Sequence, residues 1–174
     1  IETKPDEIIV HGSYLDLKDG TYDLNAKLSG TTIRFMTAFC CIVPGIKTLQ
    51  GEGRLNERPI KGLVDALRQL GADIEYLDIE GFPPLKITSS HLESKTVVMD
   101  GSVSSQFLTA ILLISKVVCD IQVSLTGQQI SQSYIDLTKH MTREWKFEGM
   151  NIYTIEGDYS AAGYFAGIAA LTGS

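Results

Sequence analysis

IRFMTAF, residues Ile33–Phe39, is matched 72 residues further along by SQFLTAI, residues Ser105–Ile111. In each copy a short segment with several hydroxyl residues leads into an apolar run with the spacing of a buried helix. The segments RPIKGLVDAL and SYIDLTKHM, which follow the two copies, also correspond, at an offset near 75 residues. One α-β-α-β unit therefore occurs twice, and we expect the copies to pack side by side around a shared core.

Helices and short strands alternate outward from this repeat. A third, partial copy begins at residue 157, where small and polar residues again precede an apolar helix. Pro59 suits the first position of the second helix, and Gly71 suits its end. Apolar residues at helical spacing predict helices over 29–43, 58–70, 104–118 and 133–145. Alternating and β-branched apolar residues predict strands over 6–17, 46–51, 73–79, 84–89, 95–101 and 120–127.

The interleaved helices and strands indicate the mixed α/β (α+β) class. We expect one domain over residues 1–174, with repeats over about 29–100 and 101–156 and a partial third from 157. No predicted strand leads into a GxGxxG turn, and the sequence has no P-loop motif, so nucleotide binding by the usual loops is unsupported.

The composition of the 174 residues is that of a globular protein, with 44% hydrophobic residues and a formal net charge of −6. This charge argues against a nucleic-acid partner, because a sequence-independent binder needs an excess of lysine and arginine. The apolar runs are too short to span a bilayer and the N-terminus lacks a signal-peptide layout, so we expect a cytoplasmic protein without a membrane partner. The cysteines at 40, 41 and 119 lie among apolar residues, which predicts buried thiols.

The helix openings carry more hydroxyl groups than capping requires. Helix N-termini expose unpaired N–H groups that attract anions, but serine and threonine are also ordinary N-caps. The openings SGTT (29–32) and SVSSQ (102–106) align Thr32-Ile33-Arg34 with Ser104-Ser105-Gln106, and GDYSAAG (157–163) is a weaker third. Because one hydroxyl suffices for a cap, we favour phosphate binding over capping alone.

Two arginines are candidates for holding an anion. Arg34 lies one turn inside an apolar helix, where an unpaired charge is costly, and its repeat equivalent is Gln106. Both copies therefore reserve the same helix face for a polar side chain. Arg58 precedes the next helix, and its guanidinium suits a phosphate or carboxylate; the alternative is a surface ion pair with Glu57 or Glu52.

The remaining polar candidates carry less information. Asp158 stands where a cap of the third helix is expected, and Ser131 and Tyr134 occupy the second repeat's equivalent of the Arg58 region. These residues together indicate a domain that binds small phosphorylated or carboxylated molecules, but they do not indicate a reaction. No metal-ligand spacing relates the histidines, which we expect to be surface or internally satisfied residues: His11, His91 and His140.

The ordered motifs SGTTIRFMTA, ERPI, SVSSQF, ISQSYI and EGDYSAAGYF resemble the 5-enolpyruvylshikimate-3-phosphate synthase family over nearly the whole chain. The SSQ triplet is unlike the sister family that acts on UDP-N-acetylglucosamine. The resemblance implies a monomeric, cytoplasmic two-domain enzyme of repeated βαβαββ units, with helices around a shared core and short sheets outside. It also implies transfer of the enolpyruvyl group of phosphoenolpyruvate to shikimate 3-phosphate in aromatic amino-acid biosynthesis, without a metal or organic cofactor.

The same resemblance implies roles for individual residues of this chain. Arg34 and Asp158 are expected to support the site, whereas the acid–base carboxylates of the family match no residue here. Residues that correspond to the family's shikimate 3-phosphate site are Ser104, Ser105, Gln106, Ser131 and Tyr134. Residues that correspond to its phosphoenolpyruvate site are Gly30, Arg58 and Gln106.

Departures from the family pattern bear on activity. Leu28 stands where the family usually has asparagine, Ser133 replaces a proline, and the segment before EGDYS is shortened. The family's N-terminal Lys-Ser segment and its C-terminal half have no counterpart in these residues. We therefore expect a substrate-binding domain of a longer synthase, without catalytic residues and inactive by itself. The alternative is a truncated or degenerate homologue that acts as a non-catalytic binding module.

Overall fold

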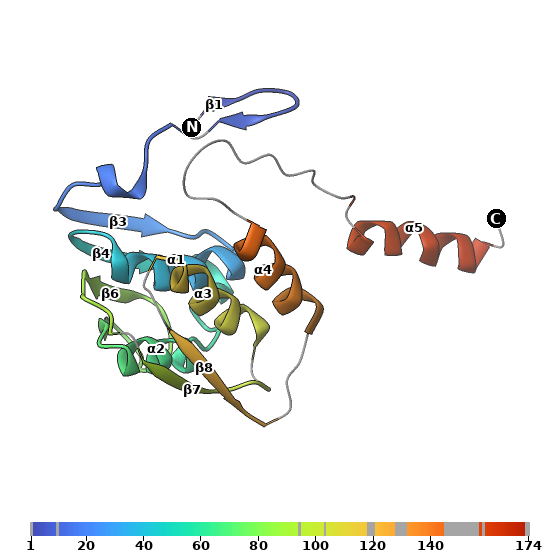
Figure 1. Ribbon diagram of the computed structural model, residues 1–174. Helices are drawn as coiled ribbons and strands as arrows, with labels where there is room; N and C mark the ends of the chain where they lie inside the picture. The colour runs from blue at the N-terminus through green and yellow to red at the C-terminus, as the bar shows by residue number, and fades with distance from the viewer. Residues whose placement is uncertain are drawn as a thin grey trace. The chain divides into compact units, whose positions relative to one another are not determined.

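The computed structural model divides the chain into two compact units, Ile1–Arg143 and Glu144–Ser174. Helices and strands alternate along the first unit, which confirms the predicted mixed α/β class (Figure 1). The second unit contains the helix α5 (Tyr159–Thr172). The structure describes residues 2–9, 11–93, 95–102, 104–117, 121–127, 132–144, 157 and 159–172. Within these ranges, no helix combines the length and the apolar character that a membrane span requires.

The first repeat is a complete βαβαββ unit. Its elements in chain order are β3 (Thr21–Asn25), α1 (Gly30–Ile42), β4 (Ile46–Gln50), α2 (Lys61–Gln69), β5 (Asp73–Tyr76) and β6 (Leu85–Thr88). β3 and β4 pair in parallel, which requires the crossover that α1 provides. β6 pairs antiparallel with both β4 and β5, so the order of strands in the sheet is β3-β4-β6-β5.

The second repeat has the same order of elements as far as the structure describes it. These elements are β7 (Thr96–Asp100), α3 (Ser105–Ser115), β8 (Gln122–Thr126) and α4 (Gln132–Glu144). β7 and β8 pair in parallel, as β3 and β4 do in the first repeat. The same parallel pairing therefore occurs in both copies, whereas the predicted limits of the repeats and of a single domain over 1–174 stay predictions.

The N-terminal segment differs from the strand predicted over residues 6–17. Among the described residues of this range, strand structure is limited to β2 (Ile8–Ile9), which pairs antiparallel with β1 (Glu2–Thr3). Residues Tyr14–Asp16 form a 3₁₀ helix, η1, because nearby side chains take the backbone N–H groups. The Ser13 N–H donates to Asp16 Oδ2 at 2.7 Å, and the Leu15 N–H donates to Ser13 Oγ at 3.2 Å. The prediction of a continued strand was wrong.

Two further elements were predicted incompletely. The strand β3 was missed, because only Tyr22 and Leu24 alternate with its polar residues and both are half-buried. Helix α2 begins at Lys61 rather than at Pro59, since Ile60 is the N-cap and its N–H donates to the carbonyl of Gly81 at 2.8 Å. A short 3₁₀ helix, η2 (Gly53–Leu55), lies in the loop before it.

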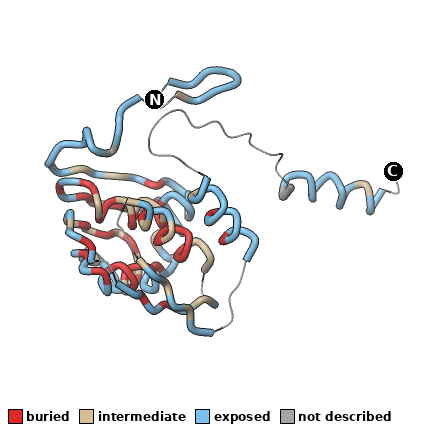
Figure 2. The backbone as a smooth tube through the Cα atoms, viewed as in Figure 1, coloured by how far each residue is buried: buried red, intermediate tan, exposed pale blue. Residues whose placement is uncertain are grey.

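The hydrophobic core of the first unit forms where the helices meet. α1 and α3 pack against each other, and α2 contacts both of them and β7. Buried positions gather on these elements and on the sheet strands (Figure 2). Burial raises the pKa of Cys40 to about 11 and that of Cys41 to about 12, which confirms the prediction of buried thiols at these positions, whereas Cys119 lies outside the described residues. Large side chains at the centre of this hydrophobic core include Ile33, Leu49, Leu63, Leu67, Ile87 and Ile111.

A tight turn joins the end of α1 to β4. Buried Lys47 of β4 donates to the carbonyl oxygens of Cys40, Val43 and Gly45, and so satisfies the C-terminal end of the helix. Gly45 has a φ of +91°, and a Cβ built on it would lie 2.2 Å from the carbonyl oxygen of Gly20. Only glycine fits this position, which sets the register between β3 and β4.

Replacement of Gly45 by alanine tests the importance of this turn. We expect Gly45→Ala to lower the free energy of unfolding by more than about 2 kcal/mol, because left-handed strain and a backbone clash act together. Gly53→Ala is the matched control: its φ is +51° but a Cβ there would meet no atom within 4 Å. The control should cost only about 1 kcal/mol in urea denaturation. Equal losses for the two variants would contradict the clash.

Candidate functional site

Both helix openings singled out in the sequence have serine N-caps. Ser29 Oγ accepts from the Thr32 N–H at 3.1 Å, and Ser104 Oγ accepts from the Gln106 N–H at 3.3 Å. Ser29 and Ser104 are therefore N-caps, and phosphate binding by Ser104 stays a prediction. Ser105, by contrast, has a side-chain hydroxyl that bonds to no group in the described part of the chain. One hydroxyl at the start of α3 is thus left over after the helix is capped.

The two helices begin at different points of the sequence repeat. At the offset of 72 residues Ser104 aligns with Thr32, but the cap of α1 is Ser29, so α1 starts almost one turn earlier. The added turn carries Gly30 and Thr31. These two residues therefore have no helical counterpart in α3, and both take part in the contacts described next.

Arg34 and Gln106, the repeat-equivalent polar residues, bond directly to each other across the α1–α3 interface. Arg34 Nη1 donates to Gln106 Oε1 at 2.9 Å and to the carbonyl oxygen of Gly30 at 2.9 Å. The amide of Gln106 then donates from Nε2 to Thr31 Oγ1 at 3.1 Å. Arg34 is only 6% exposed, and its guanidinium lies over the ring of Phe107 with the ring centre 5.6 Å away.

Arg58 brings a second guanidinium to the same place. A Cβ built on Gly30 would lie 2.5 Å from Arg34 Nη1 and 2.8 Å from Arg58 Nη1, so both cations flank this glycine. Burial, and secondly the like charge of Arg58, lowers the pKa of Arg34. Two cations at close range, with no carboxylate of the described residues paired to either, favour a bound anion.

The predicted alternative for Arg58, an ion pair with Glu57 or Glu52, was wrong. Glu57 pairs with Arg54 at 3.9 Å, and Glu52 pairs with Lys27 at 2.6 Å. Across the described residues, Arg58 forms neither an ion pair nor a side-chain hydrogen bond. Its charge is therefore available to a ligand.

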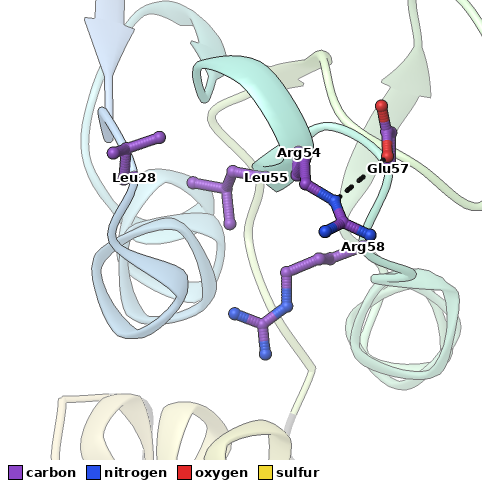
Figure 3. Close-up of a pocket in the computed structure, with 5 residues that line it drawn as sticks. All are labelled: Leu28, Arg54, Leu55, Glu57 and Arg58. Carbon is purple, nitrogen blue, oxygen red and sulfur yellow. Dashed lines mark ion pairs between the residues drawn. The ribbon is translucent and has the colours of Figure 1, made fainter.

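A pocket of about 410 Å³ opens beside Arg58. In Figure 3 the side chain of Arg58 extends away from the ion pair between Arg54 and Glu57. The other walls are Leu55 and Leu28, and Leu28 is 73% exposed. The wall of the pocket thus combines the unpaired guanidinium of Arg58 with apolar side chains. One of these is Leu28, at a position where the sequence resemblance predicts asparagine.

Other predicted site residues are not joined to this cluster. Tyr134 lies in the first turn of α4 and is 59% exposed, and no described contact connects it with Arg34, Arg58 or Gln106. α4 is linked to α3 through Thr109 and Thr138, whose hydroxyl oxygens lie 3.4 Å apart. The predicted residues Ser131 and Asp158 lie outside the described residues.

The three histidines lie at the surface, as predicted. His11 is exposed, with Nε2 3.4 Å from Glu2 Oε2, and His91 and His140 are also exposed. No cluster of three or more histidine, cysteine or acidic residues suited to a metal occurs among the residues that the structure describes.

Two participants were not singled out from the sequence, Thr31 and Phe107. Thr31 belongs to the SGTT opening, but its role depends on the early start of α1, which the repeat alignment hides. Phe107 was counted as a core residue of the apolar run, and its contact with a guanidinium gives no signal in the sequence.

Comparisons with known proteins all lead to one family. The family model for EPSP synthase (3-phosphoshikimate 1-carboxyvinyltransferase) matches residues 1–174. The chain is 39% identical to the 3-phosphoshikimate 1-carboxyvinyltransferase of Bacteroides fragilis, over 90% of this chain and 42% of that protein. It is 41% identical to the protein of the same name from Vibrio atlanticus, over 83% of this chain and 38% of that protein.

The fold also resembles a solved structure. EPSP synthase from Acinetobacter baumannii superposes with a TM-score of 0.56 at 22% identity, over 75% of this chain and 28% of that one. This likeness concerns the fold alone. The chain spans about two fifths of the length of the curated relatives it matches.

Gly30→Ala tests the placement of the two guanidinium groups. The added methyl group would overlap Nη1 of both arginines, so we expect the affinity for inorganic phosphate to fall about ten-fold, in line with the loss of a charge-assisted hydrogen bond. Gly163→Ala in α5 is the control, because its Cβ would meet nothing within 4 Å. Titration followed by NMR measures both variants, and unchanged affinity in Gly30→Ala would remove the cluster from consideration as an anion site.

Proposed function

The chain belongs to the EPSP synthase family, and on this premise we propose that the intact protein makes 5-enolpyruvylshikimate 3-phosphate. In this reaction the 5-hydroxyl oxygen of shikimate 3-phosphate adds to phosphoenolpyruvate to give a tetrahedral intermediate. Elimination of phosphate then yields the enolpyruvyl product. The observation that carries the proposal is the free guanidinium of Arg58, which flanks Gly30 together with buried Arg34.

The start of α3 is the proposed site for the phosphate of shikimate 3-phosphate. Ser104 caps the helix, which leaves the hydroxyl of Ser105 available to the ligand. The helix N-terminus adds partial positive charge at the same place. Gln106 follows directly and is held from α1. Ser131 and Tyr134 complete this proposed site on the strength of the family resemblance alone.

The pocket beside Arg58 is the proposed site for phosphoenolpyruvate, which carries a phosphate and a carboxylate. The guanidinium of Arg58 can donate two parallel hydrogen bonds to either group, and Gly30 lets the anion approach the helix closely. Gln106 is proposed to contact both ligands, since it belongs to the start of α3 and bonds to α1 at Thr31. Asp158 and Arg34 are proposed to support the arrangement.

The rest of the reaction needs groups outside this chain. Stabilisation of the tetrahedral intermediate requires acid–base groups and cations from both sides of the cleft. We therefore propose a cytoplasmic, monomeric enzyme without a metal or organic cofactor, in which residues 1–174 supply mainly the shikimate 3-phosphate site. By itself this chain should bind substrate but not turn it over.

A non-catalytic binding module is the second candidate. Leu28 favours it, since this apolar side chain lines the pocket where the family usually has an amide. The two candidates differ in one outcome: if the intact protein binds shikimate 3-phosphate but releases no phosphate from phosphoenolpyruvate, the module is the correct description.

Ser105→Ala tests the proposed phosphate site without disturbing the cap. Loss of one hydrogen bond to a charged group should weaken binding of shikimate 3-phosphate about ten-fold in calorimetry on the intact protein. Ser124→Ala, at an exposed position of β8, should leave the affinity within about two-fold, as expected for a surface site. Binding that is insensitive to Ser105→Ala would place the phosphate elsewhere.

Arg58→Gln tests the proposed phosphoenolpyruvate site. Because no carboxylate in the described ranges pairs with Arg58, we expect its loss to raise the KM for phosphoenolpyruvate about ten- to hundred-fold. Arg54→Gln is the matched control, since Arg54 lines the same pocket but pairs with Glu57. Steady-state kinetics of the intact protein should show less than about a three-fold change for the control. Equal effects of the two variants would speak against a specific role for Arg58.

A further inference from the structure

We propose that Thr31 is a positioning residue: its hydroxyl fixes the carboxamide of Gln106 in the orientation that a ligand meets. The ligand named in the test rests on the proposed function, whereas the contact itself does not. Gln106 Nε2 lies 3.1 Å from Thr31 Oγ1, on the turn of α1 that has no counterpart in the second repeat.

The orientation of the Gln106 amide follows from its neighbours. Arg34 can only donate hydrogen bonds, so the atom of Gln106 that lies 2.9 Å from Arg34 Nη1 must be the oxygen. The nitrogen then faces Thr31, whose hydroxyl oxygen is able to accept. Each end of the amide is thus assigned by a different residue of α1.

These contacts form a closed circuit. Arg34 Nη1 also donates to the carbonyl oxygen of Gly30, and Gly30 is bonded in the chain to Thr31. The circuit therefore links Gly30 to Arg34, Arg34 to Gln106 and Gln106 to Thr31, and both of its ends lie in the same turn of α1. A side chain held at both ends in this way has little rotational freedom left.

The circuit leaves part of the amide unused. A carboxamide has two N–H donors and two oxygen lone pairs, and the contacts with Thr31 and Arg34 use one of each. One N–H and one lone pair remain for a ligand with hydroxyl groups. Without the Thr31 hydroxyl, the ligand would have to order the amide on binding, which weakens affinity.

The neighbouring threonine does not share this role. Thr32 Oγ1 donates to Ser29 Oγ at 2.7 Å and belongs to the N-cap of α1. Both threonines are exposed and lie in the first turn of the same helix, but only Thr31 reaches α3. Thr32 therefore provides a matched control for the loss of a hydroxyl at this helix start.

The test uses calorimetric titration of the intact protein with shikimate 3-phosphate. Thr31→Val, which keeps the branched shape, should weaken binding about three- to ten-fold, the cost of ordering one side chain. Thr31→Ser should restore the affinity, and Thr32→Val should stay within about two-fold. In a Gln106→Ala background, Thr31→Val should have no further effect. Unchanged binding in Thr31→Val, or the same loss with and without Gln106, would overturn the proposal.

A second measurement separates this inference from the proposed function. If the unmodified protein does not bind shikimate 3-phosphate, the proposed function fails. Thermal unfolding of the unmodified protein, of Thr31→Val, of Gln106→Ala and of the double variant then tests the contact between the two residues. Non-additive changes between Thr31→Val and Gln106→Ala would support the positioning contact, and additive changes would refute it.

Discussion

The hydrogen bond between Arg34 and Gln106 is the contact on which the rest of the arrangement depends. It joins equivalent positions of the two repeats across the interface of α1 and α3, and Arg34 is almost fully buried there. A buried guanidinium needs hydrogen-bond acceptors, and Gln106 and the Gly30 carbonyl accept from its Nη1, whereas its buried Nε has no partner among the described residues. The packing of the two helices is therefore specified by polar chemistry as well as by the apolar residues around it.

This contact explains how a repeat produces a site that is not symmetric. The first copy places a cation at the shared position and the second places an amide, and the cation donates a hydrogen bond to the amide oxygen. The early start of α1 adds Gly30, which leaves room for a second cation from Arg58. The carboxylates near Arg58 are engaged by Arg54 and Lys27, so positive charge accumulates at one point of a chain whose net charge is −6. The net charge of a chain therefore does not predict the charge of a local binding site.

The sequence predicted most of the long elements, because their apolar spacing is regular and their ends carry glycine or serine. It also identified Arg34 and Gln106 as equivalent, but the repeat alignment contains no distance and could not predict that they bond. η1 was missed because the polar groups of Ser13 and Asp16 bond to the local backbone, and β3 was missed because its apolar alternation is short. The partner of Arg58 could not be predicted, since Glu52 and Glu57 are both near in sequence and only the fold decides which cations they meet.

A double-mutant cycle on Arg34→Met and Gln106→Met measures the central contact most directly. Gln106→Met keeps the length of the side chain and Arg34→Met shortens it, and each change removes the hydrogen bond. Urea denaturation gives the free energy of unfolding for each variant. A coupling of at least about 1 kcal/mol is expected if the two residues depend on each other. Changes that add within about 0.3 kcal/mol would contradict the claim that this bond holds the two repeats together.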